Sequence, residues 1–112
     1  MVSKSLVAAS ARPMILALLK KGESYGYRIM MDVAENSGGA MEWSEAMLYP
    51  VLHRLEKEGV IQSCWKVSGE NRMRKYYRLT SEGRKELEAE KSQWLSVHAA
   101  LLKAWRAAEA AD

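Results

Sequence analysis

Apolar residues recur at helical spacing in two segments near the start of the chain. The first covers about residues 6–19, with Leu6 as its first expected core position, and the Lys-Lys-Gly sequence at 20–22 ends it. The second covers residues 25–35 and stops at the turn-favouring residues 36–39. The pattern therefore predicts two helices separated by a short connection.

A third helix is predicted from Ser44 onward. Ser44 has the side chain expected of an N-cap, and an apolar stripe follows it. The members of this stripe are Leu48, Val51, Leu52 and Leu55. Pro50 removes a backbone donor, so either the first turn is loosened or the regular helix starts close to Pro50 itself. Gly59 is the expected helix stop.

Two short segments after this helix have the pattern of β-strands. Residues 61–67 are rich in β-branched and aromatic residues, with Ile61, Trp65 and Val67 on one face. Residues 74–79 alternate again, and turn-forming residues separate the two segments. The pattern predicts an antiparallel hairpin with a long tip.

A final helix, capped by Thr80 or Ser81, is predicted to run almost to residue 112, roughly 40 Å at 1.5 Å per residue. Three helices, a hairpin and a long helix are the order expected of a winged helix-turn-helix with an appended helix, a mainly α fold with a small β-hairpin. We therefore expect a DNA-binding domain at 1–80 and a dimerisation helix at 81–112. In this fold the third helix enters the major groove and the hairpin, or wing, lies along the phosphates.

The distribution of charge supports this division. The 112 residues carry a net charge of +3, and 12 of the 17 basic residues but only 8 of the 14 acidic ones precede residue 81. The hairpin contains five basic residues and a single acidic one, Glu70. The basic residues are Lys66, Arg72, Arg74, Lys75 and Arg78. Such a set is typical of phosphate binding. The alternative is a solvated hairpin whose charges serve solubility and protect its edge.

The exposed positions of the third helix leave two interpretations open. They are Ser44, Glu45, Tyr49, His53 and Arg54. These side chains either contact the edges of bases or form an ordinary solvated helix face. Beside a basic hairpin, Tyr49 and Arg54 are the best candidates for groove or phosphate contacts, and Ser44 and Glu45 are placed to reach bases from the start of the helix.

The final helix carries more apolar surface than a domain of this size needs. Its expected interface residues are Leu87, Trp94, Val97, Leu101, Leu102 and Trp105. We expect them to pack against a second copy, which would place two recognition helices about one DNA turn apart. The alternative is a helix that folds back on its own chain. Trp94 and Trp105 either pack a core or line a site for a flat aromatic effector.

Several classes of protein are disfavoured. His53, His98 and Cys64 are scattered, with no paired nucleophile and base and no zinc-site spacing, so we expect no enzyme, cofactor or metal site. No apolar stretch approaches a membrane span, and the single cysteine excludes an internal disulfide. We expect a cytoplasmic protein.

Three blocks of sequence resemble a known family. They are Tyr-Gly-Tyr-Arg-Ile at 25–29, Met-Leu-Tyr-Pro-Val-Leu-His-Arg-Leu-Glu at 47–56 and Arg-Lys-Tyr-Tyr-Arg-Leu-Thr at 74–80. The chain from about residue 13 to 83 resembles the PadR family of transcriptional regulators, in its compact subgroup with a single C-terminal dimerisation helix. One departure is Ala46-Met47, where members often have Gly-Thr or Gly-Ser, which puts base contacts from that turn in doubt.

The resemblance implies a role for several residues. Tyr49 and Arg54 match recognition-helix positions, and Tyr25 matches a second-helix residue near phosphate. Arg72, Arg74 and Lys75 match the wing, and Trp94 resembles an effector-pocket tryptophan of some members. The predicted function is a homodimeric repressor that binds a two-fold symmetric site in double-stranded DNA and is released by a small aromatic effector. The alternative is a winged-helix protein-interaction module without sequence-specific DNA binding.

Overall fold

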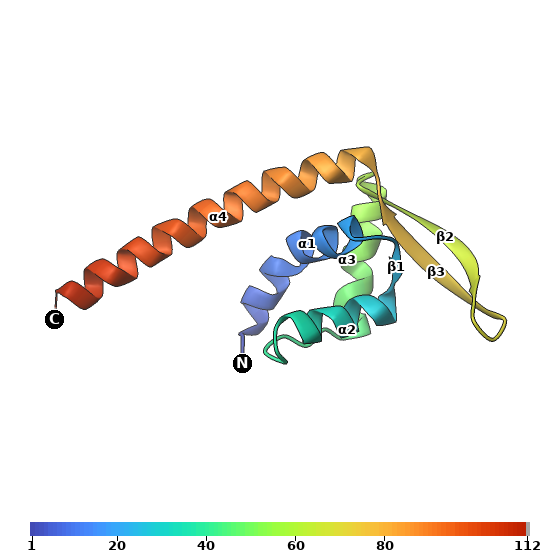
Figure 1. Cartoon of the computed structure of the whole chain (residues 1–112), viewed down its shortest axis with the longest axis horizontal. Helices are drawn as coiled ribbons and strands as arrows, with labels where there is room; N and C mark the ends of the chain where they lie inside the picture. Colours follow the sequence, from blue (N-terminus) through green and yellow to red (C-terminus); the bar gives the residue numbers. More distant parts are fainter. Residues whose placement is uncertain (112) are drawn as a thin grey trace.

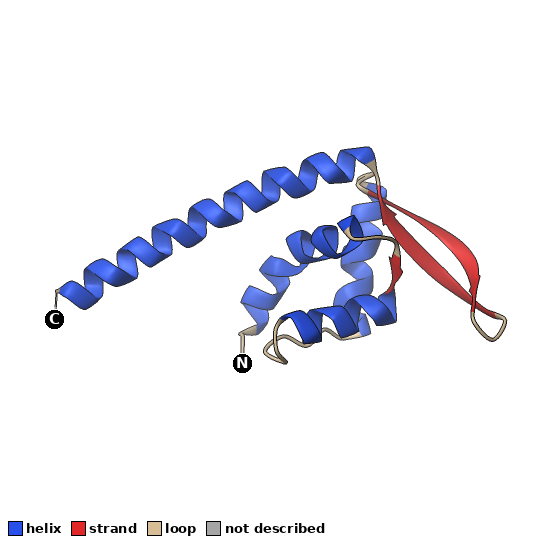
Figure 2. Ribbon diagram, in the orientation of Figure 1, coloured by secondary structure: helices blue, strands red, loops and turns tan. Residues whose placement is uncertain are grey.

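A computed structural model of the chain describes residues 1–111, and its elements follow the expected order (Figure 1). The helices are α1 (Lys4–Lys20), α2 (Gly26–Asn36), α3 (Glu45–Lys57) and α4 (Ser81–Ala110), and the strands are β1 (Ser24–Tyr25), β2 (Ile61–Ser68) and β3 (Arg72–Leu79). Helices α1 to α3 form the body, the β2–β3 hairpin projects from one side, and α4 leaves in the other direction (Figure 2). The predicted winged-helix architecture is confirmed. None of the helices in residues 1–111 is long and apolar enough to cross a membrane.

Two helix starts are set by side-chain caps at the predicted residues. The Ser44 hydroxyl accepts a hydrogen bond from the backbone N–H of Met47 at 3.2 Å, and that of Thr80 accepts one from Gly83 at 3.0 Å. Helix α3 therefore begins at Glu45 and continues through Pro50, so the alternative of a helix starting at Pro50 is wrong.

The core lies where the three body helices meet the base of the hairpin. Its fully buried members are Ile15, Leu16, Ile29, Val33, Leu48, Leu52, Leu55 and Ile61. One position differs from expectation. Leu6 is 57% exposed because Val7, Ala11 and Ile15, which pack into or against the core, lie on the opposite face of α1. Trp43, in the loop before α3, is also buried in the core.

The sheet has three strands in the order β1-β3-β2, all antiparallel. The two-residue strand β1 was not expected from its sequence, because a strand this short has no alternation of its own and exists only through its pairing with β3. The hairpin is also more fully paired than predicted, since Ser68 lies opposite Arg72. The tip is therefore short, and Glu70 and Asn71 turn the chain at positive φ angles of 61° and 58°.

Helix α4 has a packed beginning and an unpacked remainder. Gly83 and Leu87 are buried against the body, and Leu87 belongs to the core of its own chain with 7% of its surface exposed. From residue 91 to 111 every residue except Leu102 is exposed. The helix extends well beyond the body and contributes to a longest dimension of 62 Å (Figure 1).

A cluster of charges holds the start of α4 at its angle to the body. The Arg12 guanidinium on α1 lies 2.9 Å from Glu58 after α3, and 3.7 Å and 3.4 Å from Glu86 and Glu90 on α4. Burial raises the pKa of Glu90 above its usual value, although the charge of Arg12 acts in the opposite direction. The Arg12 guanidinium thus links α1 to two carboxylates of α4 and to one at the C-cap of α3.

Candidate nucleic-acid interface

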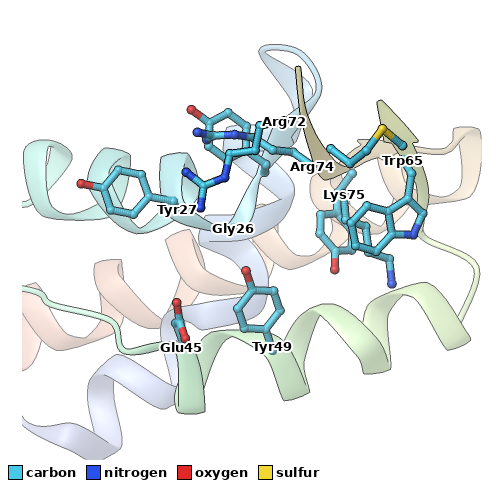
Figure 3. Close-up of a pocket in the computed structure, with 11 residues that line it drawn as sticks. Gly26, Tyr27, Glu45, Tyr49, Trp65, Arg72, Arg74 and Lys75 are labelled. Carbon is cyan, nitrogen blue, oxygen red and sulfur yellow. The ribbon is translucent and has the colours of Figure 1, made fainter. Parts of the chain in front are cut away.

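A cleft of about 590 Å³ lies between α3 and the hairpin, and the start of α2 closes one end (Figure 3). Tyr49 and Glu45 form the α3 side of the cleft, and Arg72, Arg74 and Trp65 reach into it from the hairpin (Figure 3). The sequence predicts that α3 enters the major groove and that the wing lies along the phosphates, so this cleft separates the two elements expected to contact DNA.

Two arginines supply the unpaired positive charge of the cleft. The Arg74 guanidinium lies 4.4 Å from the ring centroid of Tyr25, and that ring in turn meets Tyr76 edge-on at 5.3 Å. Neither Arg72 nor Arg74 forms an ion pair with another residue of the described chain. A guanidinium oriented by an aromatic ring and free of carboxylates is suited to bind phosphate.

The two lysines of the hairpin are less available. Lys66 pairs with Glu23, and this hydrogen bond raises the lysine pKa. Lys66 also does not line the cleft. Lys75 does line it, but its ammonium lies 3.9 Å from a carboxylate oxygen of Glu56. The charge excess predicted for the hairpin is therefore concentrated at its arginines.

A glycine allows the recognition helix to approach α2 closely. A Cβ atom on Gly26 would overlap the Tyr49 hydroxyl and lie 2.8 Å from the ring carbon Cζ. Tyr49 thus occupies the space that a side chain at position 26 would fill.

Tyr77 also lines the cleft. Burial raises the pKa of Tyr77 to about 12, and the nearby Tyr49 and Glu56 add to the shift. The Tyr77 hydroxyl therefore stays neutral at physiological pH.

The remaining α3 candidates do not line this cleft. His53 and Arg54 are exposed farther along the helix, where they face solvent. Ser44 uses its hydroxyl for the helix cap and borders a separate apolar hollow beside Met47. Of the predicted DNA-binding residues, the structure brings six together at the cleft. They are Tyr25, Glu45, Tyr49, Arg72, Arg74 and Lys75.

Five residues that line the cleft were not predicted as part of the site: Gly26 and Tyr77, described above, and Tyr27, Trp65 and Met73. Tyr27 is exposed and its ring extends away from the arginines (Figure 3), and only its position in the Tyr-Gly-Tyr block pointed to it. Trp65 was predicted to share one face of its strand with Ile61 and Val67 but was not assigned to the site, and no sequence signal pointed to Met73. Both are exposed because the hairpin is longer than the body beneath it.

Comparisons with known proteins agree on one family. Residues 15–89 match the family model described as the transcriptional regulator PadR-like family. A transcriptional regulator of Clostridium thermocellum has a TM-score of 0.83 and 32% identity, covering 92% of this chain and 97% of that one. A PadR family transcriptional regulator of Eggerthella lenta has a TM-score of 0.76 and 29% identity, covering 88% and 84%. The negative transcriptional regulator PadR of Bacillus subtilis is 36% identical over 84 residues, which are 75% of this chain and 44% of that protein.

Proposed function

Because the chain belongs to the PadR-like family of transcriptional regulators, we propose that it is a homodimeric repressor that binds a two-fold symmetric operator and is released by a small aromatic effector. Membership of this family makes it a DNA-binding regulator of transcription and not an enzyme. The Bacillus subtilis relative is named a negative transcriptional regulator, and this name supports the proposal that the present chain is a repressor.

The observation that carries DNA binding is the pair of arginines across the cleft from α3. Arg72 and Arg74 have no carboxylate partner among residues 1–111, and Tyr49 of α3 faces them from the opposite wall. With α3 in the major groove, the sugar–phosphate strand beside it would meet both guanidinium groups. Arginine binds phosphate oxygens with two donors, so this contact fixes the register of the protein on the duplex.

The free part of α4 supports a dimer. Trp94, Val97, Leu101 and Trp105 are all exposed and follow at intervals of three and four residues, so they share one face of the helix. Large apolar side chains gathered on one exposed stripe usually mark an interface. Leu87 is not part of the proposed surface, because it is already packed in the core of its own chain.

Two tryptophans on this stripe support an aromatic effector. Trp94 and Trp105 both have exposed indole surface on α4. When two such helices pack, any space left between the indole rings would be apolar and flat, which suits an aromatic molecule. A ligand held there would change the angle between the two α4 helices and hence the spacing of the two clefts.

The test is a gel shift with an operator selected from genomic fragments by the purified protein. We expect the charge reversal R72E/R74E/K75E to abolish retention and leave the oligomeric state unchanged. A control with the same number of reversals, K85E/K91E/K103E on α4, separates loss of the cleft from loss of net charge, and light scattering verifies the oligomeric state of each. Equal affinity of the native protein for unrelated duplexes would contradict the proposal. Retention by the cleft variant would favour a protein-interaction module.

A further inference from the structure

The Arg12 guanidinium joins the ends of two other helices to α1. Its Nη1 contacts Glu58, the C-cap residue of α3. Its Nη2 lies near Glu86 and Glu90 on α4. The two nitrogens of one planar group therefore face different elements. Because a guanidinium presents its donors in a rigid fork, this arrangement restrains the orientation of α4 relative to α3 as well as their distance. We call these four residues the Arg12 hub.

The Arg12 hub is better shielded from solvent than the other ion pair between α1 and α4. The side chains of Arg12 and Glu90 are 26% and 14% exposed. Those of Lys20 and Glu88, which lie 3.5 Å apart, are 53% and 59% exposed. Exposed pairs contribute little, because solvent screens them and their side chains lose entropy when they pair. Loss of one partner from a shielded pair costs more, since the other charge is left uncompensated. The hub is therefore the stronger restraint on α4.

Glu90 is also the last residue of α4 that an ion pair of the described chain ties to the body. The stripe proposed as the dimer interface begins one helical turn later, at Trp94. Between these two residues α4 is exposed and touches no other part of the core. In a dimer joined through this stripe, the start of α4 is therefore the pivot about which each body would turn.

The Arg12 hub and the cleft lie at opposite ends of α3. Glu58 caps the C-terminus of this helix, whereas Glu45 and Tyr49 near its start line the cleft. The helix from Glu45 to Glu58 is about 20 Å long at about 1.5 Å per residue. A rotation of about 10° at the hub would therefore move the start of α3 by about 3.5 Å, close to the rise of about 3.4 Å per base along one DNA strand. The two-fold partner would move equally, so the distance between the two α3 helices would change by about two base pairs.

We propose that Arg12 is a positioning residue for operator recognition, which fixes the direction in which α4 leaves the body and thereby the half-site spacing that the dimer accepts. The proposal rests on the dimeric, DNA-binding function proposed above. No residue of the hub lines the cleft, so Arg12 acts through α3 and α4. Among residues 1–111, Arg12 forms the only ion pairs of Glu58, Glu86 and Glu90. Without it, three uncompensated carboxylates repel one another and push α4 away from the end of α3.

The binding experiment uses the selected operator, versions with one or two base pairs added or removed between its half-sites, and an isolated half-site. For Arg12→Gln we expect affinity for the native spacing to fall about tenfold, as when about a tenth of the dimers keep the matching geometry. The native spacing should no longer be the one bound best. Affinity for the isolated half-site should stay unchanged, because the cleft is intact. Lys20→Gln, which breaks the exposed pair between α1 and α4, is the matched control and should keep the native preference.

The single cysteine of the chain allows the geometry to be measured without DNA. Cys64 is exposed on the wing, so one spin label per protomer reports the distance between the two wings of a dimer by pulsed electron paramagnetic resonance. We expect Arg12→Gln to shift this distance by several ångströms, because each wing turns with its body about the hub. The labelled Lys20→Gln control should give the native distance.

An unchanged distance between the wings, or an unchanged spacing preference, in Arg12→Gln would overturn the positioning role and leave DNA binding standing. An equal loss of affinity for the operator and the isolated half-site would also overturn it, because the substitution would then have damaged the body itself. If the native protein is monomeric or binds no operator, the proposed function fails together with the positioning role. Should Arg12→Gln lose its folded circular dichroism signal, Glu90→Ala, which removes only the last attachment of α4, decides the question by the same readouts.

Discussion

Replacing Gly83 by alanine tests how closely α4 is docked on the body. A Cβ atom at this position would overlap the carbonyl oxygen of Val60 and lie 2.7 Å from Cδ1 of Leu79. The leucine side chain can turn away, but the carbonyl belongs to the backbone and accepts the N–H of Thr80 at 3.1 Å. The first turn of α4 must therefore shift outward, and that shift also stretches the cap bond from the Gly83 N–H to the Thr80 hydroxyl.

The magnitude follows from three opposing contributions. Overpacking in a well-packed site costs about 1–3 kcal/mol. A weakened N-cap costs about 1 kcal/mol more. Alanine regains about 1 kcal/mol of helix propensity relative to glycine. The expected net loss in the free energy of unfolding is thus about 1–3 kcal/mol, measured by urea titration at one fixed protomer concentration, since a dimer makes stability concentration-dependent.

Two other glycines serve as matched comparisons. Gly69, near the hairpin tip, has open space around its Cα and an ordinary φ angle, so Gly69→Ala should change stability by less than about 0.5 kcal/mol. Gly26→Ala displaces the movable end of the Tyr49 side chain. It should reduce operator affinity more than stability. If Gly83→Ala is as stable as Gly69→Ala, then α4 is not docked on the Val60 carbonyl and the reasoning is refuted.

Two further predictions concern α4. Burial raises the folded-state pKa of Glu90 above its ordinary 4.5, so the folded protein binds that proton more tightly than the unfolded chain does, and native stability should fall as pH rises from about 4.5. In thermal melts across pH 4 to 7, Glu90→Gln should remove this loss of stability with rising pH. The control Glu88→Gln, at an exposed position of the same helix, should retain the loss. Parallel pH profiles of the Glu90 variant and the native protein would contradict the assignment of the pH dependence to Glu90. Leu101→Glu should shift the protein to monomer in light scattering and weaken operator binding, and an unchanged mass would argue against the α4 interface. A flat aromatic ligand should quench tryptophan fluorescence in the native protein but much less in Trp94→Leu, and unaltered emission across a varied panel would count against the effector site.

Local features of the chain determined the element order and several of its boundaries. Ser44 and Thr80 cap α3 and α4 as expected, because an N-cap depends on one side chain and the backbone three residues later. The alternation within residues 74–79 predicted β3, and the buried positions of this strand are Tyr77 and Leu79. The run of basic residues at 72–75 likewise marked the wing. Each of these signals lies within a few residues of the structure it specifies.

Contacts between distant segments were decided by the tertiary structure alone. Glu23 neutralises Lys66 from 43 positions away, so the sequence count overstated the free charge of the hairpin. Leu87 carries the same apolar signal as Trp94, yet the docking of α4 buries the first and leaves the second exposed. Trp65 had the period of a core residue. Its exposure follows from the length of the hairpin relative to the body, because periodicity specifies which face a side chain is on, and only packing decides whether another element covers that face.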